Sequence, residues 1–403
     1  MKSTNKKMTL SIAIALYMLN LEKEVILMTI DDIIYKNIIV RDNIPENPTS
    51  HIDKVIESVC CDSGLTIKMI YSNFVFPRII TFGEKSVLIW DQTYWELFRL
   101  YLAYFTDLNA TQKKIVLYDN DFVPPKILIP LAYYLAMIVK DKNLALNFAY
   151  YYKCKMLERQ VIFTDINSDE LSQYVEIAKM YVAVHEQTHF RYKNDKIQKA
   201  LDFKFIEDML DIAHILFESY DESYCKAEYL KSKSELLEMV NTARSNDDLK
   251  EELLCDTYSL NNCISVYRNV WKKKYSEKKI ITKCLETIRI VNYYNSILVS
   301  LKIFWQNCDC NIDEVNIHRH EMSSRMYLFE VIAATQIIQQ DLQDYDDENL
   351  WNYNGFEDNY TLENIMHSYF FNEKALEYWK NIFSSDIREK LLDKDIYELL
   401  NWR

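Results

Sequence analysis

Apolar residues recur with two different periods along this chain, and the first period is that of strands. Short runs rich in β-branched and aromatic residues lie at 33–40, 65–71, 75–82 and 86–90. Such runs are typical of strands, and Gly83-Glu84-Lys85 between the last two predicts a hairpin turn. We therefore expect a small, mostly antiparallel sheet near the N-terminus.

From Asp91 onwards the spacing of apolar residues becomes that of amphipathic helices. After Pro130 the chain has no further proline and a single glycine, which favours helices joined by short polar connections. The predicted helices are 93–105, 127–140, 144–157, a long one from about 168, one or two within 197–244 broken near 220–223, one from about 246 to 267 or beyond, and a helical region over 280–403 that is clearest at 317–341.

These patterns predict an α+β chain in four parts. Residues 1–28 form a leading segment, 29–160 the sheet with its helices, 161–270 a helical core, and 271–403 a large helical C-terminal part. Lysines precede an apolar run at 8–19 that resembles a short signal peptide, but no small-residue cleavage site follows. Because this run is too short to span a bilayer, we interpret it as a leading helix or a mis-called start, with Met28 as the alternative initiator.

The most informative motif is His185-Glu186-Gln187-Thr188-His189, which lies late in the helix predicted from residue 168. His185 and His189 are four residues apart, so both imidazoles lie on one helix face. They continue the apolar stripe that includes Tyr181, and we therefore expect them to face packed protein. Two imidazoles at this spacing can hold one zinc ion, with Glu186 beside it to activate a water molecule. The alternative is that both are ordinary helix histidines.

A third ligand is expected from the segment Glu251-Glu252-Leu253-Leu254-Cys255-Asp256. Catalytic zinc commonly takes two histidines and one glutamate, and Glu252 is the favoured residue, with Glu251 as the alternative. Asp256 lies one helical turn further on. It is suited to accept the second ring N–H of a ligating histidine. Either carboxylate could instead be a solvated side chain near the start of a helix.

HExxH followed by a downstream E-x-x-C-D resembles the gluzincin class of zinc metallopeptidases. Cys255 stands where that class usually has alanine, and the residues after His189 lack the metzincin extension. The resemblance implies Glu252 as ligand, Asp256 as the histidine-orienting carboxylate and a zincin-like placement of the active-site helices. It also implies a cleft-lining edge strand that pairs with extended substrate, for which the hairpin over 75–90 is the candidate.

In the mechanism that follows, Glu186 accepts a proton from water and passes it to the leaving amine. A second donor usually stabilises the transition-state oxyanion. His320 is weakly favoured for this role, and Tyr258 and His318 are further candidates.

Composition narrows the class of protein. The net charge of −13 disfavours nucleic acid as the main partner, and three glycines exclude a glycine-rich phosphate loop. Nine cysteines without a C-x-x-C pair indicate reduced thiols in a cytoplasmic protein. The acidic stretch 341–358 lacks EF-hand spacing and is interpreted as a loop.

We therefore expect a cytoplasmic, narrow-specificity zinc metallopeptidase with a regulatory or defence role, no membrane span, a protein or peptide substrate and a regulatory partner. The alternatives are a non-catalytic helical interaction protein with a structural or vestigial zinc site, and a metal-free helical scaffold. A closed structural site would more often use four ligands with several cysteines, which this motif lacks.

Overall fold

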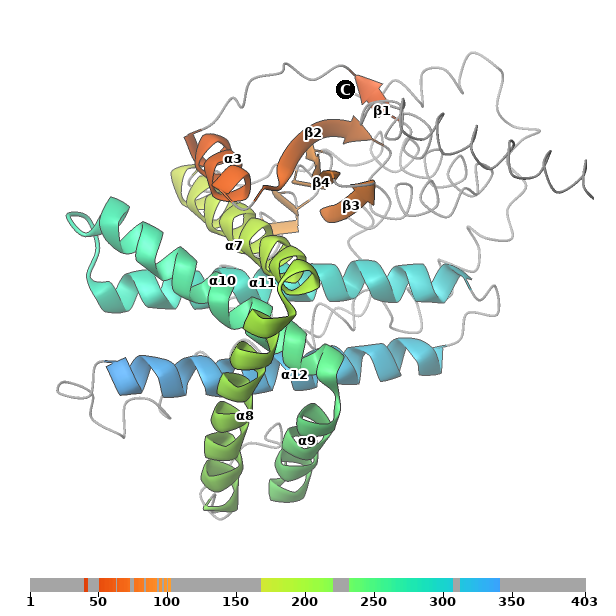
Figure 1. The fold of residues 1–403 in the computed structure, drawn as a ribbon, viewed down its shortest axis with the longest axis vertical. Coiled ribbons are helices and arrows are strands. Elements are labelled where there is room, and N and C mark those ends of the chain that lie inside the picture. Colours follow the sequence, from red (N-terminus) through yellow and green to blue (C-terminus); the bar gives the residue numbers. More distant parts are fainter. Residues whose placement is uncertain are drawn as a thin grey trace, which may run out of the picture.

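The structure is a computed structural model, and it describes residues 40–42, 51–102 apart from 63, 73–75, 83–84, 93, 96–97 and 100, then 168–219, 232–306 and 312–340 (Figure 1). Several predictions lie outside these residues. They concern the leading segment, the strand before Val40, the helices at 127–140 and 144–157, the interruption at 220–223 and the chain after 340.

The described part is mostly helical and carries one small mixed sheet, in agreement with an α+β chain. Its strands are β1 (Val40–Asp42), β2 (Thr66–Ser72), β3 (Arg78–Phe82) and β4 (Lys85–Asp91), in the order β1-β2-β4-β3. The predicted hairpin is present, since β3 pairs antiparallel with β4. The sheet is mixed because β4 also pairs with β2 in parallel, whereas β1 and β2 are antiparallel.

Burial explains why β4, and not β3, lies inside the sheet. Residues 86–91 are all buried, so both faces of β4 are covered, as is usual for an interior strand. β3 carries Arg78 and Thr81 and takes the edge, where polar side chains protect the free backbone.

Helix α3 (His51–Asp62) precedes β2 and was not among the predicted elements. It buries Ile56 and Cys60, one turn apart, in the core. Its end is closed by Gly64 at φ +78°, and the amide of Leu65 donates to the carbonyl of Cys60 at 3.0 Å. A glycine in this left-handed conformation is a common helix C-cap, so α3 stops here and the chain turns into β2.

The remaining described helices follow the predicted pattern closely. They are α7 (Ser168–Asn194), α8 (Lys196–Glu218), α9 (Lys233–Ser245), α10 (Asp247–Trp271), α11 (Glu277–Gln306) and α12 (Ile312–Gln340). Asn246 caps the start of α10, since its side-chain oxygen accepts from the amides of Asp248 and Leu249. No helix in the described ranges is long and apolar enough to cross a membrane.

Helix α10 is central, because it packs against α7, α8, α9, α11 and α12 (Figure 1). The helix α7 also contacts α3 and the edge strand β3, so it lies between the sheet and the other helices. A single hydrophobic cluster runs from α3 and the sheet into these helices. The two helices that carry the predicted zinc motifs, α7 and α10, therefore meet inside the core.

Candidate metal centre

The two histidines of the HExxH motif face the two acidic residues predicted on α10. His185 and His189 are one turn apart on α7, with ring centroids 4.8 Å apart. Helix α10 presents Glu252 and Asp256, also one turn apart, to this face of α7. The four-residue spacing seen in both motifs thus produces two stripes that meet where the helices pack.

The imidazole Nε2 atoms and the Glu252 carboxylate converge on one point. The two Nε2 atoms lie 3.1 Å apart. Glu252 places Oε2 at 3.4 Å from Nε2 of His185 and Oε1 at 3.3 Å from Nε2 of His189. Ligand atoms bound tetrahedrally to zinc at about 2.0–2.2 Å stand roughly 3.3–3.6 Å from one another. Each of the three residues offers one ligand atom, and these atoms all lie within 4.8 Å of one another. The donor set and its spacing therefore fit one zinc ion.

Both imidazoles turn their second nitrogen towards a carboxylate. Nδ1 of His189 is hydrogen-bonded to Oε1 of Glu251 at 2.8 Å, and Lys199 of α8 contacts the other oxygen of Glu251. Nδ1 of His185 lies 3.1 Å from Oδ1 of Asp256, within ion-pair distance although outside hydrogen-bond geometry. Carboxylates in this position usually fix the ring and tautomer of a ligating histidine.

Glu251 and Glu252 thus take different positions. Glu252 faces both Nε2 atoms, whereas Glu251, the alternative ligand, stands behind His189. Consecutive residues on a helix point about 100° apart, so the packing of α10 decides which carboxylate enters the centre. The position of Glu252 agrees with its choice as the favoured ligand, whereas the place of Glu251 behind His189 was not predicted.

Asp256 is completely buried and holds a dense polar network. Its Oδ1 accepts from the hydroxyl of Tyr181 at 2.5 Å. Arg325, on α12, donates from Nε to Oδ2 at 2.9 Å and from Nη2 to Oδ1 at 2.7 Å, and its Nη1 lies 2.6 Å from Oε2 of Glu252. Sequence reasoning missed Arg325; α12 also carries Arg319, and the one local signal for Arg325 was its position directly ahead of the apolar stretch of that helix.

These contacts set the charges of the centre in the protein without a bound metal. Burial raises the pKa of the Asp256 carboxyl, but Arg325 and His185 outweigh this and lower it to about 2. The pKa of Glu252 is also lowered, again by Arg325 and the histidines against the effect of burial. Burial lowers the pKa of His185, but Asp256 and Glu252 outweigh it and raise the value to about 10.

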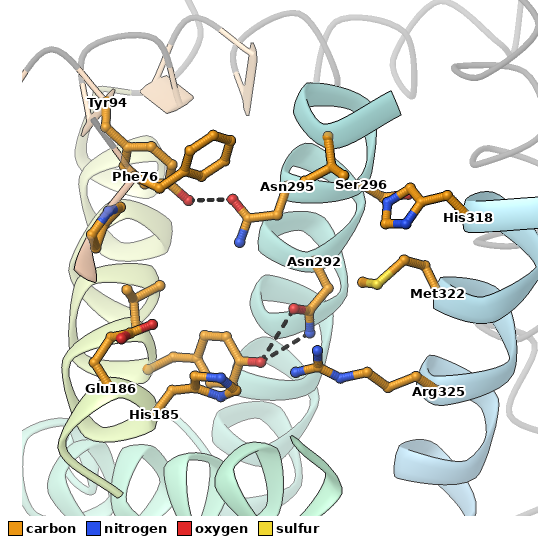
Figure 2. A pocket seen from close by; sticks show the side chains of 14 residues that line it. Phe76, Tyr94, His185, Glu186, Asn292, Asn295, Ser296, His318, Met322 and Arg325 are labelled. Atoms are coloured by element: carbon orange, nitrogen blue, oxygen red, sulfur yellow. Dashed lines mark hydrogen bonds between the residues drawn. The ribbon is translucent and has the colours of Figure 1, made fainter. Parts of the chain in front are cut away.

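A cavity of about 280 Å³ opens beside the centre, between α7, α11, α12 and the segment that enters β3 (Figure 2). Single stripes of each helix form its walls, with residues spaced three or four apart. The lining comprises Tyr181, Val182, His185 and Glu186 of α7; Asn292, Asn295, Ser296 and Val299 of α11; His318, Met322 and Arg325 of α12; and Phe76, Pro77 and Tyr94.

Glu186, the predicted general base, lies on this cavity wall next to His185. Burial raises the pKa of its carboxyl, and the neighbouring histidines oppose this effect. A carboxylate that faces a cavity beside a group of potential metal ligands can exchange protons with a molecule held there.

The structure separates the three candidates for the second donor. His318 lines the cavity, and its Nε2 has no hydrogen-bond partner within the described part of the chain. His320, the favoured candidate, is exposed and does not line the cavity. Two residues along α12 amount to a rotation of about 200°, so His318 and His320 point to nearly opposite sides. Tyr258 also lies away from the cavity, packed against the guanidinium of Arg191 at 5.0 Å.

The hairpin expected to meet the substrate lies beside α7. Among the described strands β3 lies at an edge of the sheet, and Thr81 near its end accepts a hydrogen bond from Nζ of Lys193 at 3.2 Å. Phe76 and Pro77, directly before β3, line the cavity. One edge of the sheet and the candidate centre are therefore neighbours.

Comparisons with protein-family models, with curated proteins and with solved structures give no match for this chain. The zincin-like placement of the helices and the gluzincin resemblance thus stay predictions.

Proposed function

We propose that this protein is a zinc-dependent metallopeptidase that hydrolyses peptide bonds of a protein or peptide substrate. His185, His189 and Glu252 would hold the metal, and Glu186 would act as general base. The observation that carries the proposal is the convergence of two Nε2 atoms and one carboxylate, each imidazole backed by a second carboxylate, beside a cavity that His185 and Glu186 line.

A zinc ion bound by these residues would supply the Lewis acidity that polarises a substrate carbonyl and acidifies a water molecule. Glu186 accepts the proton of the attacking water and delivers it to the leaving amine, since its carboxylate faces the same cavity. Glu251 and Asp256 keep both Nε2 atoms turned to the centre throughout. His318, on the opposite wall, is placed to donate to the developing oxyanion.

The substrate would approach along β3. An extended peptide can pair with the backbone of an edge strand, and β3, at the edge of the described sheet, lies beside α7 and directly follows the cavity-lining Phe76 and Pro77. Pairing of this kind recognises main-chain groups, while the cavity receives a side chain.

The composition of the centre favours catalysis over a purely structural zinc site. Structural sites are usually closed by four protein ligands rich in cysteine. Within the described ranges, the group that could hold a metal has three members and no cysteine. Cys255, the nearest thiol in sequence, is buried, and burial raises its pKa well above the usual range, which opposes the thiolate form that metals need.

The test is metal content by elemental mass spectrometry, followed by cleavage of a mixed peptide library read by mass spectrometry. We expect about one zinc per wild-type chain and clearly less in Glu252→Ala, whereas Glu238→Ala, on an exposed position of α9, keeps the metal. Glu186→Gln should retain zinc and lose nearly all cleavage. Absence of zinc from folded, zinc-reconstituted wild type would refute the metal site, and full cleavage by Glu186→Gln would refute the mechanism.

A further inference from the structure

Arg325 connects two residues that the zinc centre uses in different ways. Three of its nitrogen atoms contact Glu252 and Asp256: Nε and Nη2 donate to the two oxygens of Asp256, and Nη1 lies 2.6 Å from Oε2 of Glu252. Its side chain is only 14% exposed, so water competes weakly for these contacts. A planar guanidinium can serve two carboxylates at once, whereas a lysine ammonium is a point charge without this fork.

These contacts restrict the side chain of Glu252, the proposed zinc ligand. Glu252 is 34% exposed, and a free glutamate there would sample several rotamers. With Oε2 beside Nη1 of Arg325, the other oxygen is left facing Nε2 of His189 at 3.3 Å. The arginine therefore selects the side-chain orientation in which the carboxylate points to the metal position.

The same guanidinium fixes the orienting carboxylate. Asp256 receives two hydrogen bonds from Arg325 and one from Tyr181, and it lies 3.1 Å from Nδ1 of His185. One side chain of α12 thus acts on a ligand from α10 and, through Asp256, on a ligand from α7.

We propose that Arg325 is a positioning residue of the zinc centre, which holds Glu252 and Asp256 in the arrangement that binds the metal. This inference rests on the proposed zinc site. The direction in which zinc affinity changes when Arg325 is replaced separates this role from simple electrostatics. Arg325 is a cation near the position of a divalent cation, so Coulomb repulsion alone predicts tighter zinc binding when its charge is removed. Positioning predicts weaker binding.

The test measures zinc dissociation constants by competition with a chromogenic chelator in wild type, Arg325→Lys and Arg325→Met. The lysine variant keeps the charge and loses the fork, and the methionine variant loses both. We expect both to bind zinc about 10–100-fold more weakly, the usual cost of losing an outer-shell partner. Visible spectra of the Co²⁺-substituted proteins should also change, because they report the arrangement of the ligands.

Folding is controlled separately. Arg325→Met leaves Asp256 buried without its cation, which destabilises proteins strongly. Should it fail to fold by circular dichroism, Arg325→Lys decides the test. The matched control is Arg289→Lys, which alters a buried arginine paired with Glu330 between α11 and α12 and is not among the residues that line the cavity or form the candidate metal group. Its zinc affinity should equal that of wild type.

Weaker zinc binding in Arg325→Lys with an unchanged control supports the inference. Wild-type or tighter binding in the folded Arg325 variants overturns it and leaves the proposed function intact. A wild-type protein that binds no zinc overturns both.

Discussion

Asp256→Asn is the substitution whose effect the structure defines best. Asparagine keeps the shape of the side chain and removes its charge. The residue is completely buried, and its main ionic partner is Arg325. Removing one partner of a buried ion pair costs about 3–5 kcal/mol of unfolding free energy. We expect the lower end, about 3 kcal/mol, because Arg325 keeps Glu252 as a second partner.

Zinc should enlarge this deficit, the loss of unfolding free energy in Asp256→Asn relative to wild type. Losing the group behind Nδ1 of His185 should weaken zinc binding about 10–100-fold. At saturating zinc, that loss adds about 1.4–2.7 kcal/mol to the stability difference, because a ligand stabilises a protein in proportion to the logarithm of its affinity. The difference between wild type and Asp256→Asn should therefore rise from about 3 kcal/mol without zinc to roughly 4–6 kcal/mol with it.

Chemical denaturation followed by far-ultraviolet circular dichroism measures both differences, with chelator in one series and excess zinc in the other. Asp202→Asn is the matched control. Asp202 is a buried aspartate of α8 that accepts from Tyr192 and Arg191 and contacts neither imidazole. Its deficit should be the same in both series. An Asp256→Asn deficit that zinc leaves unchanged would show that Asp256 supports the fold and not the metal.

Two further predictions concern pH and the second donor. Burial lowers the pKa of His185, but Asp256 and Glu252 raise it to about 10. Because zinc binds only neutral imidazole, zinc affinity should fall about tenfold for each unit by which the pH is lowered, for each proton that the metal displaces. Competition titrations at about pH 6 and about pH 8 measure this, and equal affinities would contradict it. His318→Ala should lower turnover about 10²–10³-fold with zinc content unchanged, whereas exposed His320→Ala should have no effect. Wild-type turnover in His318→Ala would remove that residue from the reaction.

Local rules predicted the parts of the site that lie within one helix. The spacing of His185 and His189, and of Glu252 and Asp256, fixes their shared faces wherever α7 and α10 lie. The N-cap of α10 is likewise local, since Asn246 accepts hydrogen bonds from amides two and three residues ahead. Residues of this kind can be placed from sequence because the geometry of the helix does not depend on its partners.

Tertiary packing decided the rest. Glu251 and Glu252 differ only in helix rotation, and so do His318 and His320; which member of each pair enters the site depends on how α10 and α12 pack. Arg325 is 69 residues from Asp256, beyond the reach of any local pattern. The parallel pairing of β2 with β4 was also beyond the reach of local patterns. It requires β3 to lie at the edge, and the alternation of residues within a strand does not encode the order of the strands.

The charges around the centre argue for a divalent cation on grounds independent of the motif. Each imidazole is backed by a carboxylate, and each of these carboxylates by a cation from a third helix: His185 by Asp256 and Arg325, His189 by Glu251 and Lys199. Together with Glu252 and Glu186 this makes four carboxylates against two cations, an excess of two negative charges. Two protons can balance that excess, which is why the pKa of both His185 and His189 is raised despite burial, and one zinc ion can balance it as well. Zinc would compete with these protons for the same Nε2 atoms, so each carboxylate that raises the proton affinity of a ring would also raise its basicity towards the metal.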